Sequence, residues 1–155
     1  MREYGRRAAL VLMLSGVAGC RLAPERERER NRNRLHPGES PEVRRLITRY
    51  ADLYDVPRGL VHRVVQRESG YNPAARNGPY YGLMQILPQT AATMGHRGPP
   101  KSLLNADTNL RFGVKYLRGA YLVADGDQDA AIGWYSRGYY YEAKRLGLLE
   151  ETGLR

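Results

Sequence analysis

Apolar residues recur at helical spacing from residue 43 onward. The first run places apolar side chains three or four positions apart, at Val43, Leu46, Ile47, Tyr50, Ala51 and Tyr54. Ser40 and Pro41 precede this run, and they form a typical N-cap followed by proline at the first helical position. The pattern predicts an amphipathic helix that begins at Pro41.

The rest of the chain predicts further helices and little else. They are expected at about 57–69 and 88–94, from about 110 to Asp125-Gly126, from Asp127 to about Tyr135, and from Tyr139 to Leu146. Residues 70–82 predict a loop, because they are rich in Gly, Pro, Asn and Tyr. We find no alternating strand pattern and no internal repeat, so the expected fold class is mostly α, with little or no sheet, around one small core.

The first forty residues carry a different pattern. A positively charged stretch to Arg7 is followed by an apolar run over 8–17, which is too short to span a bilayer as a helix. The run ends in Val17-Ala-Gly-Cys20, which resembles the lipobox of bacterial lipoproteins. The alternatives are a plain secretory signal with an incidental cysteine, or a retained membrane anchor.

The lipobox resemblance implies cleavage before Cys20 and acylation of its thiol. It also implies that residues 1–19 are a signal peptide and that the mature protein is lipid-anchored in the periplasm. Arg21 in place of an aspartate favours the outer membrane. Residues 20–40 alternate Arg and Glu with almost nothing to bury, so they predict a flexible charged tether before a domain over 41–155.

Composition narrows the function classes. The chain has 155 residues, which allows one domain, and its single cysteine excludes an intramolecular disulfide framework. Its three histidines lie 26 and 34 residues apart, so no metal site is predicted from local spacing, and no cofactor is expected. The net charge of +9 divides into +4 for residues 1–40 (nine Arg, five Glu) and +5 for 41–155 (16 Lys and Arg, 11 Asp and Glu). Because the arginines do not gather on one helix, nucleic acid is not the expected partner.

Glu68 stands out in the second predicted helix. Leu60, Val61, Val64 and Val65 form the apolar stripe of this helix, and at about 100° per residue Glu68 projects within roughly 20° of Val61. A carboxyl group directed at aliphatic surface has a raised pKa, which suits a general acid. The ordinary alternative is that the helix frays at Ser69-Gly70, where Glu68 turns to water or pairs with an arginine.

Four sequence blocks around and after Glu68 occur in a recognisable order. They are Glu68-Ser-Gly-Tyr-Asn-Pro, Gly82-Leu-Met-Gln-Ile-Leu-Pro-Gln-Thr-Ala, Asn109-Leu-x-x-Gly-x-x-Tyr-Leu and Ala131-x-x-Trp-Tyr-Ser-x-Gly. Together the blocks resemble the catalytic domain of the SLT family of bacterial lytic transglycosylases, which are related to goose-type lysozyme. The resemblance covers about residues 41–145.

The resemblance implies a lysozyme-like helical fold and an enzyme that cleaves the MurNAc–GlcNAc bond of peptidoglycan to form 1,6-anhydro ends. It implies Glu68 as the single catalytic acid and base, and it places Met84, Gln85 and Tyr135 at the substrate. Leu83 and Ile86 are expected in the core, together with Tyr50 and Tyr54. Five tyrosines are candidates for the sugar groove: Tyr80, Tyr81, Tyr139, Tyr140 and Tyr141. We expect a monomer.

The chain also departs from the family pattern. Arg76 stands where the family usually has serine, Ser136 stands where it usually has asparagine, and a late Glu-Thr-x-x-Tyr-Val block has no counterpart. These departures leave open a peptidoglycan-binding lipoprotein that is either non-catalytic or hydrolytic, as a lysozyme is. For a hydrolase, Asp107 would be a candidate for positioning the water, because it lies next to a family block.

Overall fold

The computed structural model describes residues 34–155, of which Leu35–Arg155 form one compact, mostly helical unit. Its helices are α2 (Pro41–Leu53), α3 (Arg58–Ser69), α4 (Pro88–Thr93), α5 (Ala106–Val123), α6 (Gln128–Arg137) and α7 (Tyr140–Leu146), with a 3-10 helix η1 at Pro100–Leu104. The mostly α class is confirmed, and each predicted helix is present with its ends shifted by a few residues. The predicted signal peptide, Cys20 and most of the predicted tether lie outside the described residues.

A small sheet was not predicted. Strands β1 (Arg76–Asn77) and β2 (Tyr80–Tyr81) pair antiparallel inside the expected 70–82 loop, with Asn77 opposite Tyr80. Two residues are too few to show an alternating pattern, and Gly78-Pro79 alone predicts only a turn. The hairpin matters here because its strands border the site described below.

Side-chain caps stabilise the helix starts that the sequence predicted. The Ser40 hydroxyl accepts a hydrogen bond from the Val43 N–H at 3.2 Å, and the Asp127 carboxylate accepts one from the Ala130 N–H at 2.8 Å. Each cap satisfies a backbone donor that the first turn leaves unpaired, a contribution of about 1 kcal/mol. These caps confirm the starts that the sequence predicted.

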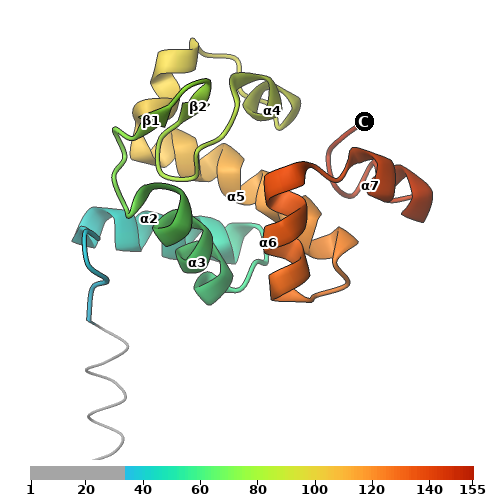
Figure 1. Ribbon diagram of the computed structural model, residues 1–155, viewed down its shortest axis with the longest axis horizontal. Coiled ribbons are helices and arrows are strands. Elements are labelled where there is room, and N and C mark those ends of the chain that lie inside the picture. Colours follow the sequence, from blue (N-terminus) through green and yellow to red (C-terminus); the bar gives the residue numbers. More distant parts are fainter. Residues whose placement is uncertain (1–33) are drawn as a thin grey trace, which may run out of the picture. The chain divides into compact units, whose positions relative to one another are not determined.

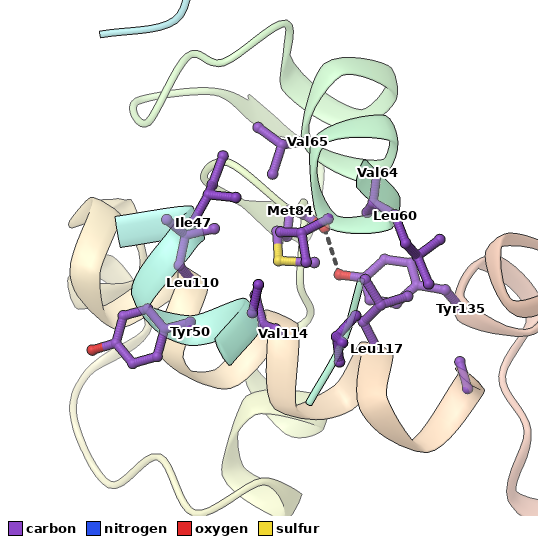
Figure 2. Packing of buried hydrophobic residues seen from close by; sticks show 14 of the residues in the cluster. Ile47, Tyr50, Leu60, Val64, Val65, Met84, Leu110, Val114, Leu117 and Tyr135 are labelled. Atoms are coloured by element: carbon purple, nitrogen blue, oxygen red, sulfur yellow. Dashed lines mark hydrogen bonds between the residues drawn. The ribbon is translucent and has the colours of Figure 1, made fainter. Parts of the chain in front are cut away.

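Helix α5 is the centre of the fold (Figure 1). It contacts α2, α4, α6, α7 and η1, with the β1–β2 hairpin and α4 near one end and α6 near the other. Its buried face carries Leu110, Val114 and Leu117, which pack with Ile47 of α2 and Leu60 of α3 (Figure 2). Burying each such side chain contributes about 1.5–3 kcal/mol. Within the part of the chain that is described, no helix combines the length and the apolarity needed to cross a bilayer.

Residues 35–40 belong to the domain, which corrects the prediction of a flexible tether up to residue 40. The Glu39 carboxylate is fully buried and accepts hydrogen bonds from Arg44 Nε and Nη2 at 2.6 Å each and from the His36 N–H at 2.8 Å. His62 Nδ1 of α3 lies 3.8 Å from the same carboxylate. In the sequence, Glu39 looks like one more charged residue of the Arg/Glu tether. Its burial is possible because Arg44 pairs with its carboxylate.

Tertiary packing therefore joins two histidines that are far apart in the sequence. Ligand-type atoms of His36, Glu39 and His62 lie within 4.8 Å of one another. Arg44 engages both Glu39 oxygens, so the cluster holds the segment before α2 against α3.

This cluster predicts a pH-dependent stability. Burial, together with the charges of Arg44 and His36, lowers the pKa of His62 to about 4, although Glu39 acts in the opposite direction. An unfolded histidine titrates near 6.5, so between about pH 6.5 and pH 4 the unfolded chain binds a proton that the folded chain does not. The contribution of His62 is complete above pH 6.5 and is lost as the pH falls toward 4.

We expect the free energy of unfolding to drop by about 2 kcal/mol between pH 7 and pH 5 because of His62. Urea unfolding at these two values, for the wild type and His62→Gln, measures the effect. Glu39 does not interfere, because its pKa is lowered from an ordinary value that is already below this range. An equal drop in both proteins would contradict the assignment.

Candidate active site

Glu68 lies in the last turn of α3, where the apolar stripe ends. Leu60, Val61, Val64 and Val65 are buried in the core, and Glu68 continues their face of the helix to the edge of a cleft. Its side chain is 24% exposed. Burial raises the pKa of Glu68, as the sequence predicted, and the Arg67 guanidinium at 3.7 Å partly opposes the rise. The helix continues past Glu68 to Ser69 and ends at Gly70, so it does not fray before the carboxyl group.

The cleft consists of two adjoining hollows. The first, of about 330 Å³, is lined by Arg67, Glu68, Asn77, Tyr80, Gln85, Tyr135 and Ser136. The second, of about 310 Å³, shares Tyr80, Gln85, Tyr135 and Ser136 with it and continues to Arg137 and Gly138. Helix α3, the hairpin, the loop after β2 and helix α6 therefore form the walls. Of the described residues, Glu68 is the one carboxylate that lines either hollow.

The loop after β2 carries Gln85 into the cleft wall. Gln85 has a φ of 45°, and its Nε2 donates to the carbonyls of Gly82 at 2.8 Å and Ala75 at 3.2 Å. The backbone of Ile86 pairs with that of Tyr81 on the other side of this turn. Gln85 thus holds the turn and also lines both hollows, and its contact with the substrate stays a prediction.

Asn109 of α5 holds the same loop through hydrogen bonds of its side chain. Its side chain is fully buried, its Oδ1 accepts from the Met84 N–H at 2.9 Å, and its Nδ2 donates to the carbonyls of Tyr81 at 2.7 Å and Leu103 at 2.8 Å. One amide therefore ties the loop, β2 and η1 to the central helix. The sequence contained Asn109 in a family block but gave no reason to assign it this role.

Met84 belongs to the core, which corrects its expected place at the substrate. Its side chain is fully buried, and a Cβ on Gly113 of α5 would lie 2.6 Å from the Met84 sulfur. Only its backbone carbonyl takes part in the site, where it accepts a hydrogen bond from the Tyr135 hydroxyl at 2.8 Å (Figure 2). Leu83 and Ile86 are buried, as predicted.

Tyr135 forms part of the cleft floor. Its ring is 9% exposed and meets Tyr116 edge to face, and its hydroxyl is directed to the Met84 carbonyl. Burial, reinforced by the negative charge of Glu68 and by Tyr116, raises the pKa of Tyr135 well above its usual range. The phenol stays neutral and keeps its proton, so it acts as a hydrogen-bond donor beside Glu68.

The five groove tyrosines separate into three groups. Tyr80 lines both hollows, while Tyr81 is partly buried under the Arg76 guanidinium, which lies 4.5 Å from its ring. Tyr139 is buried, which corrects its expected position in the groove; its hydroxyl donates to a backbone carbonyl of α5. Tyr140 and Tyr141 are exposed, and they line a separate hollow beyond the cleft.

Asp107 lies away from the cleft. Its Oδ1 accepts from the buried Tyr50 hydroxyl at 2.8 Å, and Arg49 lies 3.8 Å from the same oxygen. Asp107 lines neither hollow that contains the cleft residues, so the structure gives it no role in positioning a water there. Tyr50 is buried and Tyr54 packs against the core, as predicted.

The chain is similar in sequence to known proteins. Residues 45–147 match the model of the transglycosylase SLT domain. The chain is 31% identical over 101 residues to the soluble lytic murein transglycosylase of Salmonella typhimurium, covering 60% of this chain and 16% of that protein. It is 30% identical over 83 residues to the soluble lytic murein transglycosylase of Escherichia coli K12, covering 49% of this chain and 13% of that protein.

Solved structures show the same relationship. The 70 kDa soluble lytic transglycosylase from Escherichia coli superposes with a TM-score of 0.58 at 26% identity, over 66% of this chain and 18% of that one. The complex of that transglycosylase with bulgecin A gives the same TM-score and identity. The likeness confirms the lysozyme-like helical fold. The chain spans less than a fifth of the length of each of these relatives.

Proposed function

Because the chain belongs to the transglycosylase SLT domain family, we propose that it is a lytic transglycosylase that cleaves the β-1,4 bond between MurNAc and GlcNAc of peptidoglycan. The observation that carries the proposal is the placement of Glu68: a partly buried carboxyl group with a raised pKa, without a second carboxylate among the described residues that line its cleft. Such a site can supply acid catalysis, but its described lining has no second carboxylate to hold a water on the opposite face of the sugar.

In the first step Glu68 acts as general acid. A protonated Glu68 donates its proton to the glycosidic oxygen as the bond from that oxygen to the muramoyl anomeric carbon breaks. Burial raises the pKa of Glu68 and so favours the protonated form that this step requires.

In the second step the sugar supplies both the group that stabilises the cation and the nucleophile. The 2-acetamido oxygen of the muramoyl residue stabilises the anomeric cation, which is the substrate-assisted exception to the two-carboxylate rule. The ionised Glu68 then removes the proton from the muramoyl C6 hydroxyl while its oxygen bonds to the anomeric carbon. An intramolecular hydroxyl has a high effective concentration, so it competes well with water. The product is a 1,6-anhydro end, and Glu68 recovers its proton.

Three neighbours support this cycle. Arg67, at 3.7 Å, stabilises the carboxylate that exists between the two steps. The hydrogen bond from the Tyr135 hydroxyl to the Met84 carbonyl fixes the position of the Tyr135 ring in the cleft floor. Gln85 adds a polar side chain to the cleft wall. We propose substrate contacts for Gln85 and Tyr135, and none for the Met84 side chain.

The nature of the product separates this proposal from a hydrolase and from a non-catalytic protein. We expect purified sacculi incubated with the protein to release muropeptides that are one water lighter than hydrolysed ones, with ends that resist borohydride reduction. Mass spectrometry before and after reduction measures this. Mainly reducible ends would assign the protein to the lysozyme-type hydrolases, and no release would support the non-catalytic alternative.

We further propose that the protein is a lipoprotein anchored through Cys20 and held at the outer membrane of the periplasm. The lipobox resemblance carries this proposal, and it agrees with a substrate located in the periplasm. In cells grown with labelled palmitate, the wild type should carry label in the membrane fraction, and Cys20→Ala should lose both label and membrane retention. Label that persists in the variant would refute the assignment.

A further inference from the structure

Next to the cleft lies a third hollow, of about 460 Å³, between the end of α6 and the start of α7. We name it the Arg137 pocket, after the residue that connects it to the cleft. It shares Arg137 and Gly138 with the adjoining hollow of the cleft, and its other walls include Trp134, Tyr140, Tyr141, Glu142 and Arg145. A substrate that lies in the cleft can therefore extend into this pocket.

The position of Arg137 depends on two residues of its own helix. Its guanidinium carbon lies 3.8 Å from the centre of the Trp134 ring, a close cation–π stack. A Cβ on Gly133 would lie 2.7 Å from Arg137 Nη1, so a side chain there would displace the guanidinium. Glycine inside a helix costs about 0.5–1 kcal/mol relative to alanine, and here it leaves room for the guanidinium.

The charges of the pocket leave Arg137 available for a ligand. Arg145 is already paired, because its Nε and Nη2 donate to the Glu142 carboxylate at 2.8 Å and 2.5 Å. In the described part of the chain, no carboxylate forms an ion pair with Arg137. A guanidinium held against an indole keeps its N–H groups in a planar fork, and this fork matches the two oxygens of a carboxylate.

The remaining walls are aromatic and open to solvent. Tyr140 is 47% and Tyr141 is 84% exposed, and their rings meet edge to face at 5.4 Å. Neither ring is needed to fill the core. Exposed aromatic walls beside a guanidinium without an ion pair to any described residue suit a ligand that has both apolar side chains and carboxylates. An uncharged sugar offers the guanidinium no ionic partner.

We propose that the Arg137 pocket binds the acidic stem peptide that peptidoglycan carries on its muramoyl residues, with Arg137 receiving a peptide carboxylate. The inference rests on the proposed function, since peptidoglycan is what brings such a peptide to the cleft. Arg137 is thereby a specificity-determining residue: it favours muramoyl strands that carry peptides over strands built of GlcNAc alone, which offer no carboxylate.

The chain contains a single tryptophan, Trp134, so its intrinsic fluorescence reports directly on this pocket. We expect the free stem tetrapeptide to change the fluorescence saturably, and the same peptide with amidated carboxylates to leave it unchanged. Arg137→Gln should weaken tetrapeptide binding at least about tenfold, as expected for loss of a charge-assisted hydrogen-bonded pair. Arg58→Gln is the matched control, because Arg58 is already paired with Asp52 and lines neither the cleft nor the Arg137 pocket, and it should bind within about threefold of the wild type.

Three results of the peptide-binding assay would overturn the inference: no fluorescence change with the tetrapeptide, equal binding of the amidated peptide, or unchanged binding in Arg137→Gln. An equal response to peptide-free chitotetraose would also overturn it, in favour of a sugar platform. The binding assay needs no turnover. A protein that binds the tetrapeptide but cleaves nothing would contradict the proposed function alone, and a protein that cleaves sacculi without binding it would contradict this inference alone.

Discussion

Replacing Glu68 by glutamine should reduce the release of soluble fragments from sacculi by about a thousandfold or more. The amide can neither donate the proton that breaks the glycosidic bond nor accept the one from the C6 hydroxyl, and general acid–base catalysis contributes about 10²–10⁴ in rate. The shape of the side chain is retained, and among the described residues the charged neighbour of Glu68 is Arg67, at 3.7 Å. The free energy of unfolding should therefore stay within about 0.5 kcal/mol of the wild type.

Two further variants make this result specific. Asp107→Asn removes a carboxylate that faces Tyr50 and Arg49 outside the cleft, so it should leave fragment release nearly unchanged. Tyr135→Phe removes only the hydroxyl held on the Met84 carbonyl, and we expect a loss of about tenfold in rate, because one neutral hydrogen bond is at stake. If Glu68→Gln kept more than a tenth of the activity, another group would have to supply the proton.

The sequence predicted those features of the site that depend on local geometry. The orientation of Glu68 follows from counting 100° per residue along α3, and its raised pKa follows from the aliphatic residues on the same face. Helix starts at Ser40 and Asp127 follow from the hydrogen-bonding capacity of their side chains. These inferences need no knowledge of the rest of the fold, and this is why they were correct.

Features that depend on contacts between distant segments were not predicted. Tyr139 looks like its neighbours Tyr140 and Tyr141 in the sequence, yet it is buried because Gly119 of α5 leaves space for its ring. Met84 is likewise drawn into the core by Gly113. Glu39 is buried because the segment before α2 packs against α3, where His62 Nδ1 lies 3.8 Å from its carboxylate. In each case the deciding partner lies on another element or in another turn, where periodicity gives no information.

Replacing Asn109 by aspartate should destabilise the protein by about 3–5 kcal/mol. The Oδ1 atom could still accept from the Met84 N–H, but the second carboxylate oxygen would face the carbonyls of Tyr81 and Leu103, which offer it no hydrogen. The Leu103 carbonyl would lose its donor, the Tyr81 carbonyl would keep only the Ile86 N–H, and a charge would be placed in a fully buried position. Each unsatisfied group costs about 1–3 kcal/mol, a large part of the 5–15 kcal/mol by which a domain is stable.

Asn105→Asp is the matched control for this variant, because it makes the same chemical change one helical turn earlier. Asn105 caps α5, with its side-chain oxygen accepting from the Thr108 N–H at 3.0 Å, and aspartate caps a helix equally well. Urea unfolding should therefore show a large shift for Asn109→Asp and almost none for Asn105→Asp. Equal stabilities would mean that the loop after β2 is held by its own turn and not by α5. The expected difference instead makes α5 the element that fixes the cleft wall: by holding the Met84 backbone, it sets the position of the carbonyl that receives the Tyr135 hydroxyl and of Gln85 beside Glu68.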